Sequence, residues 1–316
     1  MKKILALLLT IVLLMTAVVA CSNSDDDDDK DDRKSKTEKT EKEDTEEDDD
    51  EEEEEEEKKE SKGKITFEGL TVVDNDECSI EITKIDSNSN GKYELKVKLQ
   101  NKSSDKNYMF SVKRATVDGV EADPFFASEV AAGRKEVTGI TFDKEELEEY
   151  GVKEFTDIQL LFRVYDSDDW SADDVVNELV HVYPYGEDKA EKFVRKDKSS
   201  DTVLVDNDYV KVVVIGCEED KDWGRYYVNM YLENKTDKAL MFADSGIAVN
   251  GYEVNGLFTE IISPESCGFT NISISFDELE ESDIETVEEM EIDMRIYDSD
   301  HWSADNILEE TFTFEP

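Results

Sequence analysis

The stretch Tyr93-Glu-Leu-Lys-Val-Lys-Leu99 decides the fold, because its apolar residues alternate with charged ones. Successive side chains of a β-strand point to opposite faces of a sheet, so this alternation predicts a strand with one buried and one solvated face. The same pattern recurs in Tyr226-Tyr-Val-Asn-Met-Tyr-Leu232. Further strands are expected around residues 79–85, 108–117, 137–142, 158–165 and 175–183. The folded part of the chain is therefore predicted to be all-β.

Tight turns and one short helix per repeat are expected between these strands. Asp118-Gly119 and Asn250-Gly251 each lie between apolar runs, which is a strong signal for two-residue hairpins because both turn positions need a positive φ. Asp143 and Asp277 are suited to cap a short helix in each half of the folded region.

The pattern belongs to an internal duplication. Tyr165-Asp-Ser-Asp-Asp-Trp-Ser-Ala-Asp-Asp174 returns, 132 residues later, as Tyr297-Asp-Ser-Asp-His-Trp-Ser-Ala-Asp-Asn306. Short alternating strands in two copies of this length predict two tandem immunoglobulin-like β-sandwich domains. We place the first copy at residues 63–185, a polar linker at 186–202 and the second copy at 203–316.

A family resemblance supports this interpretation. It rests on Asp206-Asn-Asp-Tyr-Val-Lys-Val-Val-Val214, Glu233-Asn-Lys-Thr-Asp-Lys238, Val249-Asn-Gly-Tyr252 and Phe276-Asp277. These stretches resemble the uncharacterised immunoglobulin-like repeat of Gram-positive, clostridial-type surface lipoproteins. The resemblance covers both copies and implies their fold, but it implies no activity. The first copy departs from it at Val112-Lys113-Arg114, where we expect one extra residue and more positive charge.

Residues 1–21 have the organisation of a lipoprotein signal peptide. Lys2 and Lys3 precede an apolar run that ends in Val18-Val19-Ala20-Cys21-Ser22. Small residues before a lone cysteine resemble the lipobox of bacterial lipoproteins. The resemblance implies that Cys21 receives a diacylglyceryl group, becomes the mature N-terminus and holds the protein on the outer face of the cell membrane through acyl chains such as palmitate. The alternative is an uncleaved helix, for which residues 4–20 are at the lower limit of a membrane span.

Charge is unevenly distributed along the chain. The 83 acidic and 36 basic residues give a net charge of −47. Residues 22–62 are dominated by acidic runs and contain no aromatic or branched aliphatic residue, so they predict a disordered spacer, with an ion buffer or a partner-binding tail as the alternative. The net charge argues against a nucleic-acid partner and favours neutral, cationic or ion-bridged partners.

The repeated acidic loop is the first candidate site. In each copy it places three carboxylates within eight residues: Asp166, Asp168 and Asp173, then Asp298, Asp300 and Asp305. Calcium prefers several such oxygen ligands, which makes Ca²⁺ the one cofactor that the sequence suggests. The alternative is a surface turn in which the Asp and Ser side chains hydrogen-bond nearby backbone and the tryptophan packs over the sandwich edge.

An aromatic cluster in the second copy is the other candidate. If the alternate residues from Tyr226 to Leu232 face the core, Tyr227 and Tyr231 face outward, and Trp223 lies just before them. Exposed rings of this kind can stack on sugars or grip a peptide. The alternative is that the helix, another strand or the other copy covers them.

The sequence offers little for catalysis. His181 and His301 do not occupy equivalent positions in the two copies, and no hydrolase, zinc-protease or nucleotide-binding motif is present. Cys217 and Cys267 are left either as a disulfide or as buried thiols. We therefore predict a non-catalytic binding or adhesion protein with an extracellular protein or glycan as partner, and a structural envelope spacer as the alternative.

Overall fold

A computed structural model describes residues 63–89, 91–256, 258–301 and 303–316. The predicted signal peptide with Cys21 and the acidic spacer lie outside these residues. Both copies belong to one compact unit.

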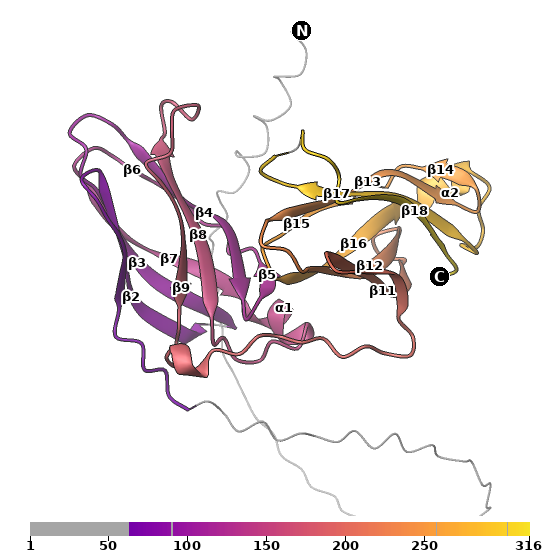
Figure 1. Cartoon of the computed structure of the whole chain (residues 1–316), viewed down its shortest axis with the longest axis horizontal. Helices are drawn as coiled ribbons and strands as arrows, with labels where there is room; N and C mark the ends of the chain where they lie inside the picture. Colours follow the sequence, from indigo (N-terminus) through magenta and orange to yellow (C-terminus); the bar gives the residue numbers. More distant parts are fainter. Residues whose placement is uncertain (1–62, 90, 257, 302) are drawn as a thin grey trace, which may run out of the picture. The chain divides into compact units, whose positions relative to one another are not determined.

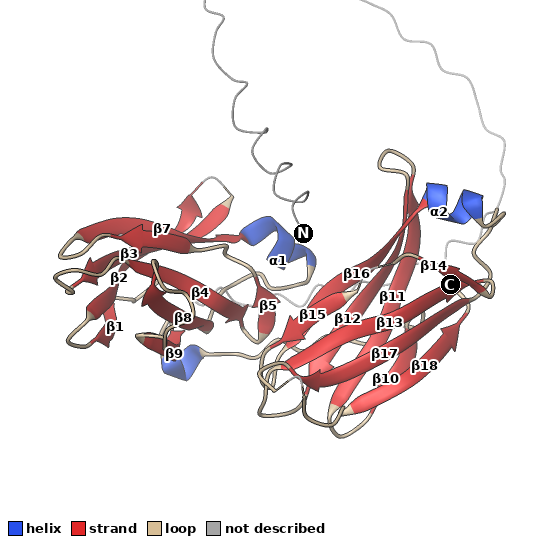
Figure 2. Ribbon diagram, turned by 90° about the horizontal axis from the view of Figure 1, so that it is seen from above, coloured by secondary structure: helices blue, strands red, loops and turns tan. Residues whose placement is uncertain are grey.

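Strands dominate the described residues (Figure 1; Figure 2), and the predicted all-β class is confirmed. In the first copy they are β1 (Leu70–Asp74), β2 (Cys78–Ser89), β3 (Lys92–Asn101), β4 (Tyr108–Val117), β5 (Val120–Ala122), β6 (Ala127–Val130), β7 (Lys135–Asp143), β8 (Ile158–Asp166) and β9 (Val176–Val182). In the second copy they are β10 (Thr202–Asp206), β11 (Val210–Asp220), β12 (Arg225–Asn234), β13 (Leu240–Val249), β14 (Tyr252–Val254), β15 (Thr259–Ile262), β16 (Cys267–Ser275), β17 (Met290–Asp298) and β18 (Leu308–Phe314).

Each copy also contains one short α-helix, as predicted. Helix α1 spans Lys144–Glu149 and α2 spans Phe276–Glu281, while a 3-10 turn at Glu187–Lys189 begins the linker. Asp143 caps α1 by accepting hydrogen bonds from two backbone N–H groups. The prediction that Asp277 caps α2 is wrong, because α2 already begins at Phe276 and Ser275 accepts the capping bond.

The two copies have the same strand order. One sheet runs β1-β2-β3-β7 in the first copy and β10-β11-β12-β16 in the second, and the other runs β5-β4-β8-β9 and β14-β13-β17-β18. The alternating stretches behave as predicted: the alternate residues of β3 and β12 that begin with Tyr93 and Tyr226 are buried. A parallel bridge between Val120 on β5 and Cys267 on β16 joins one sheet of each copy into a single larger sheet.

The predicted hairpin turns are present, with positive φ at all four turn residues. Asp118 is also a structural anchor, since one of its carboxylate oxygens accepts hydrogen bonds from the Thr156 N–H, the Thr156 hydroxyl and the Asp157 N–H. Asn250 has the same role in the second copy, where its side-chain oxygen accepts from the N–H groups of Glu288 and Glu289. Burial raises the pKa of Asp118 to about 6, although these hydrogen bonds oppose the shift.

The extra residue expected at Val112-Lys113-Arg114 is not an insertion. Strand β4 has a bulge there, but β13 has a bulge at the equivalent place, between Asp244 and Gly246, and both strands have ten residues. The positive charge expected there is present, because Lys113 and Arg114 correspond to the uncharged Ser245 and Gly246.

Candidate binding surfaces

The linker between the copies packs on the outward face of the second copy's sheet. Val213 on β11 and Tyr231 on β12 point away from their own core and join the hydrophobic cluster of the first copy. Phe269 on β16 lies beside them, 5.4 Å from Tyr231 between ring centroids. Tyr150, which follows α1, stacks on Phe269 at 4.3 Å, and the linker residue Phe193 meets the same ring at 6.1 Å. We call this contact between rings of both copies and the linker (Tyr150, Phe193, Tyr231 and Phe269) the joint.

A buried ion pair, with both partners in the linker, closes a turn there. Arg195 donates two hydrogen bonds to Asp201, both at 2.7 Å, and the backbone N–H of Lys198 donates to the same carboxylate. The bonds from Arg195 lower the pKa of Asp201 to about 2. The guanidinium also lies 5.4 Å from the centre of the Tyr231 ring, which places it between the linker and the sheet.

A groove of about 640 Å³ lies beside the joint. Its apolar lining consists of Tyr150, Phe193, Val194, Ile215 and Phe269. Its polar lining is Glu146 and Glu149 of α1, Arg195, Lys196 and Lys198 of the linker, and Asn229, Thr270 and Asn271 of β12 and β16. The groove is more polar than most small-molecule sites, but it combines aromatic rings with amides and both signs of charge at a junction of the two copies.

The three aromatic residues proposed from the sequence do not form one exposed cluster. Trp223 is 79% exposed in the turn before β12, and Tyr227 is half-buried. Tyr231 points outward as expected but is buried beneath Phe269 and Arg195. For Tyr231 the alternative holds, because other parts of the chain cover it.

The groove itself was not predicted, although its position follows from the strand pattern. Tyr227, Asn229 and Tyr231 share the outward face of β12, and in the register of the sheet Asn229 lies opposite Asn271 and Tyr231 opposite Phe269. The outward face of β12 was therefore identified from the sequence. The linker residues and Tyr150 that complete the groove could not be assigned to it from spacing.

The carboxylates proposed as calcium ligands are used mainly within their own loops. Asp166 accepts the backbone N–H of Asp168 at 3.1 Å and pairs with Lys106, and Asp298 does the same with Asp300 and Lys238. The remaining proposed ligands, Asp168, Asp173, Asp300 and Asp305, are exposed. Within the described ranges, no three His, Cys, Asp or Glu side chains are grouped so that they could hold a metal ion. The calcium hypothesis from the sequence is therefore left without a clustered set of ligands among these residues.

Hydrogen bonding dominates the electrostatics of the second loop. Burial alone would raise the pKa of Asp298, but hydrogen bonds from Lys238, the Asp300 N–H and His301 hold it below its usual value. These bonds favour the charged carboxylate, which is engaged with the protein rather than directed at solvent.

Trp170 is presented to solvent at the tip of the first loop. Its side chain is 76% exposed, so it does not pack over the sandwich edge as the surface-turn alternative supposed. The neighbouring Asp169 accepts hydrogen bonds from the N–H and hydroxyl of Ser171, which fixes the turn. The equivalent Trp302 lies outside the described residues.

The three cysteines of the described region carry free thiols. Burial raises the pKa of Cys78 to about 11 and that of Cys267 to about 12. Cys217 is half-buried.

Comparison with known proteins gives no family. No family model matches the sequence, and no curated protein matches it. Among solved structures, the chain is similar to the transglutaminase of red sea bream at 9% identity and a TM-score of 0.21, over 71% of this chain and 29% of that enzyme. The chain thus spans less than a third of that enzyme's length, and a likeness this weak supports no argument.

In the part of the chain that the structure describes, every helix is too short or too polar to cross a membrane.

Proposed function

We propose that this chain is a lipid-anchored protein of the outer face of a bacterial cell membrane, where it binds an extracellular ligand without catalysing a reaction. The lipobox-like sequence ending at Cys21 supports the anchoring, and the acidic stretch after it supports a spacer role for residues 22–62. Both rest on the sequence alone.

The groove beside the joint is the observation that carries the binding function. Its volume of about 640 Å³ is within the range of ligand sites, and its aromatic lining is already held in place by the stacked Tyr150 and Phe269 rings. Preformed walls reduce the ordering cost of binding. Asn271 is exposed at the groove, and Asn229 on the neighbouring strand keeps its amide oxygen available while its NH₂ group donates to Glu218.

A neutral glycan is the ligand class that fits this lining best. Amide and hydroxyl side chains exchange hydrogen bonds with sugar hydroxyls, and aromatic rings pack against sugar rings. Polyanionic ligands are disfavoured, because residues 63–316 contain 59 acidic and 25 basic side chains, a net charge of −34.

The test is binding of residues 63–316 to glycan and peptide arrays, with and without calcium. Asn271→Ala, in the groove, should weaken binding to any glycan found by at least about fivefold, because an amide that pairs with a ligand is lost. Asn177→Ala is the matched control, since Asn177 is an exposed strand amide on β9 outside the groove lining. Equal loss in both variants, or binding to peptides alone, would refute the glycan proposal.

The joint also favours a second candidate, an envelope spacer. Stacked rings from both copies, with a linker ring against them, would hold the two copies in one fixed arrangement. Two results together would favour this alternative. The arrays would show no ligand, and cells carrying Asn271→Ala would have the same envelope phenotype as cells carrying the wild-type protein.

A further inference from the structure

The described residues of the two acidic loops share the same main-chain hydrogen bonds. In the first copy, Asp169 N–H donates to the Asp166 carbonyl at 3.1 Å, and Val175 N–H donates to the Val164 carbonyl at 2.7 Å. In the second copy, His301 N–H donates to Asp298 at 3.1 Å and Ile307 N–H donates to Ile296 at 2.7 Å. These bonds put Asp168 and Asp300 at equivalent points of their loops, so what Asp300 binds indicates what Asp168 can bind.

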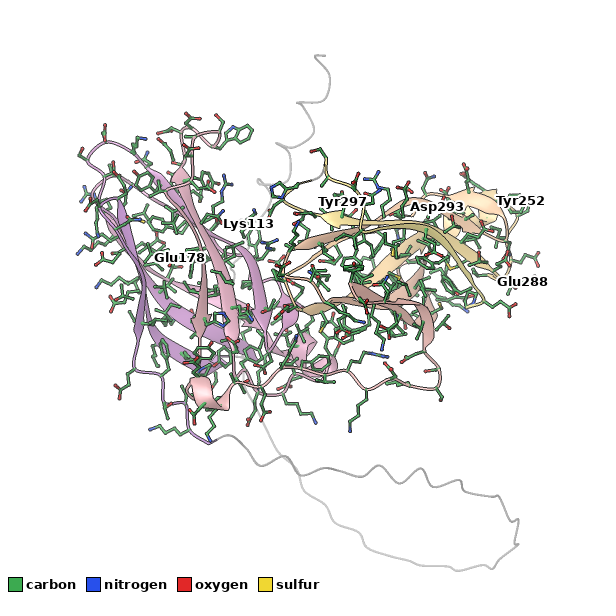
Figure 3. The ribbon with its side chains drawn as sticks, viewed as in Figure 1. Lys113, Glu178, Tyr252, Glu288, Asp293 and Tyr297 are labelled. Atoms are coloured by element: carbon green, nitrogen blue, oxygen red, sulfur yellow. The ribbon has the colours of Figure 1, made fainter. Side chains whose placement is uncertain are left out.

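The second loop is already occupied within the chain. Asp300 lies 3.5 Å from the ammonium of Lys113, and the Arg114 guanidinium donates to the Ser299 hydroxyl at 3.5 Å. Lys113, labelled in Figure 3, is followed by Arg114 at the bulge of β4 in the first copy. The loop therefore accepts a basic pair carried by a strand.

The first loop presents the equivalent groups without such a pair. Asp168, the counterpart of Asp300, is exposed and forms no ion pair with any residue of the described region. Trp170 adds a large exposed ring two residues further on. An indole face next to a carboxylate attracts Arg or Lys, because the ring binds the cation while the aliphatic stem packs on it.

Another molecule of this same protein is a poor candidate to occupy the first loop. Lys113 and Arg114 are engaged by the chain's own second loop. The equivalent surface of the second copy has Ser245 and Gly246 instead, in a hollow of about 610 Å³ whose lining includes Glu253, Glu291 and Asp293. That surface (Asp293 is labelled in Figure 3) would place carboxylates opposite Asp168, and like charges repel.

We propose that the Tyr165–Asp174 loop docks a basic, extended segment of a different extracellular protein. Asp168 would pair with a Lys or Arg of that segment, and Trp170 would cover the neighbouring basic side chain. This surface is separate from the groove, so it goes beyond the proposed glycan binding.

The experiment uses a synthetic heptapeptide with the sequence of residues 111–117, Ser-Val-Lys-Arg-Ala-Thr-Val, as the probe. It is titrated into the protein comprising both copies and followed by NMR shifts of the loop amides and the Trp170 indole. We expect saturable shifts confined to this loop, weakened by added salt because the contact is ionic. A control peptide with Ser-Gly in place of Lys-Arg should bind at least about fivefold more weakly.

Two loop variants locate the contact. Asp168→Asn should weaken the heptapeptide about threefold to fivefold, and Trp170→Ala about fivefold, as expected for exposed ion pairs and cation–π contacts. Asp208→Asn is the matched control, because Asp208 is an exposed aspartate of the second copy, and it should leave affinity unchanged. Equal binding of the two peptides, shifts outside the loop, or full affinity in both loop variants would overturn the proposal. Thermal unfolding of each variant confirms that it is folded.

Discussion

The Glu121 carboxylate on β5 accepts a hydrogen bond from the backbone N–H of Ser263 in the other copy. It lies next to the bridge that joins the two sheets, where the Cys267 N–H donates to the Gly119 carbonyl at 2.8 Å. Burial raises the pKa of Glu121 to about 7, against the opposing effects of the Ser263 bonds and the Arg114 charge. The boundary between the copies thus contains a carboxyl group that titrates near neutral pH.

Glu121→Gln should make stability less dependent on pH. The native carboxyl holds its proton more tightly than the unfolded one, so stability is highest in acid and falls as pH rises from about 4.5 to about 7. Glutamine keeps the acceptor for Ser263 but cannot ionise. In urea unfolding at several pH values, the free energy of unfolding should fall across this window by on the order of 1–3 kcal/mol less in the variant than in the wild type. Burial also raises the pKa of Glu260, so part of the dependence of stability on pH should remain in the variant. If the free energy of unfolding depended on pH as strongly in the variant as in the wild type, the role of Glu121 would be contradicted.

Asp118 offers a second test of pH dependence, because the second copy already has an asparagine, Asn250, at the equivalent position. Because Asn250 has its role in the second copy, Asp118→Asn should keep the hydrogen bonds from Thr156 and Asp157. The wild type should lose stability as pH rises from about 4 to about 6, and Asp118→Asn should remove that loss. Asp118→Ala leaves buried donors unpaired and should cost about 2–3 kcal/mol in urea unfolding at neutral pH. Equal costs for the two variants would show that the hydrogen bonds do not matter.

Asp201→Ala should release the linker. It removes the partner of a guanidinium whose side chain is only 9% exposed, and breaking a buried ion pair costs about 3 kcal/mol or more. Limited proteolysis should then cut between residues 190 and 201 at least about tenfold faster. Asp188→Ala is the control, because Asp188 is exposed and pairs only loosely, at 3.8 Å, with Lys189. Similar cleavage of both variants would mean that the ion pair does not hold the linker.

Calcium should leave the stability of residues 63–316 nearly unchanged. Asp166 and Asp298 already accept backbone hydrogen bonds and pair with Lys106 and Lys238, so a cation would have to displace these partners. We expect a shift in melting temperature below about 1 °C at millimolar Ca²⁺. A rise of several degrees, absent with Mg²⁺, would establish a site by linkage.

The elements were predictable because local alternation determines which side of a strand is buried. Tyr93 and Tyr226 face their cores as their spacing required, and the two Gly-containing hairpins form where positive φ was expected. The cap of α2 was misassigned because both Ser275 and Asp277 suit that role and only the helix start decides between them.

The sites were less predictable because they depend on contacts between distant segments. Tyr231 was correctly placed on the outward face, but its burial depends on Phe193 and Arg195, which lie in a polar run without periodicity. The different surroundings of the two acidic loops likewise follow from the Lys113–Arg114 pair, about 185 residues away in sequence from Ser299.

The bridge between β5 and β16 also has a mechanical consequence. A molecule held in the groove would touch α1, the linker and the sheet of the second copy simultaneously. Tension applied through it would be shared between the main-chain hydrogen bond at the bridge and the stacked rings of Tyr150 and Phe269. Such a joint would yield only when several weak contacts fail together.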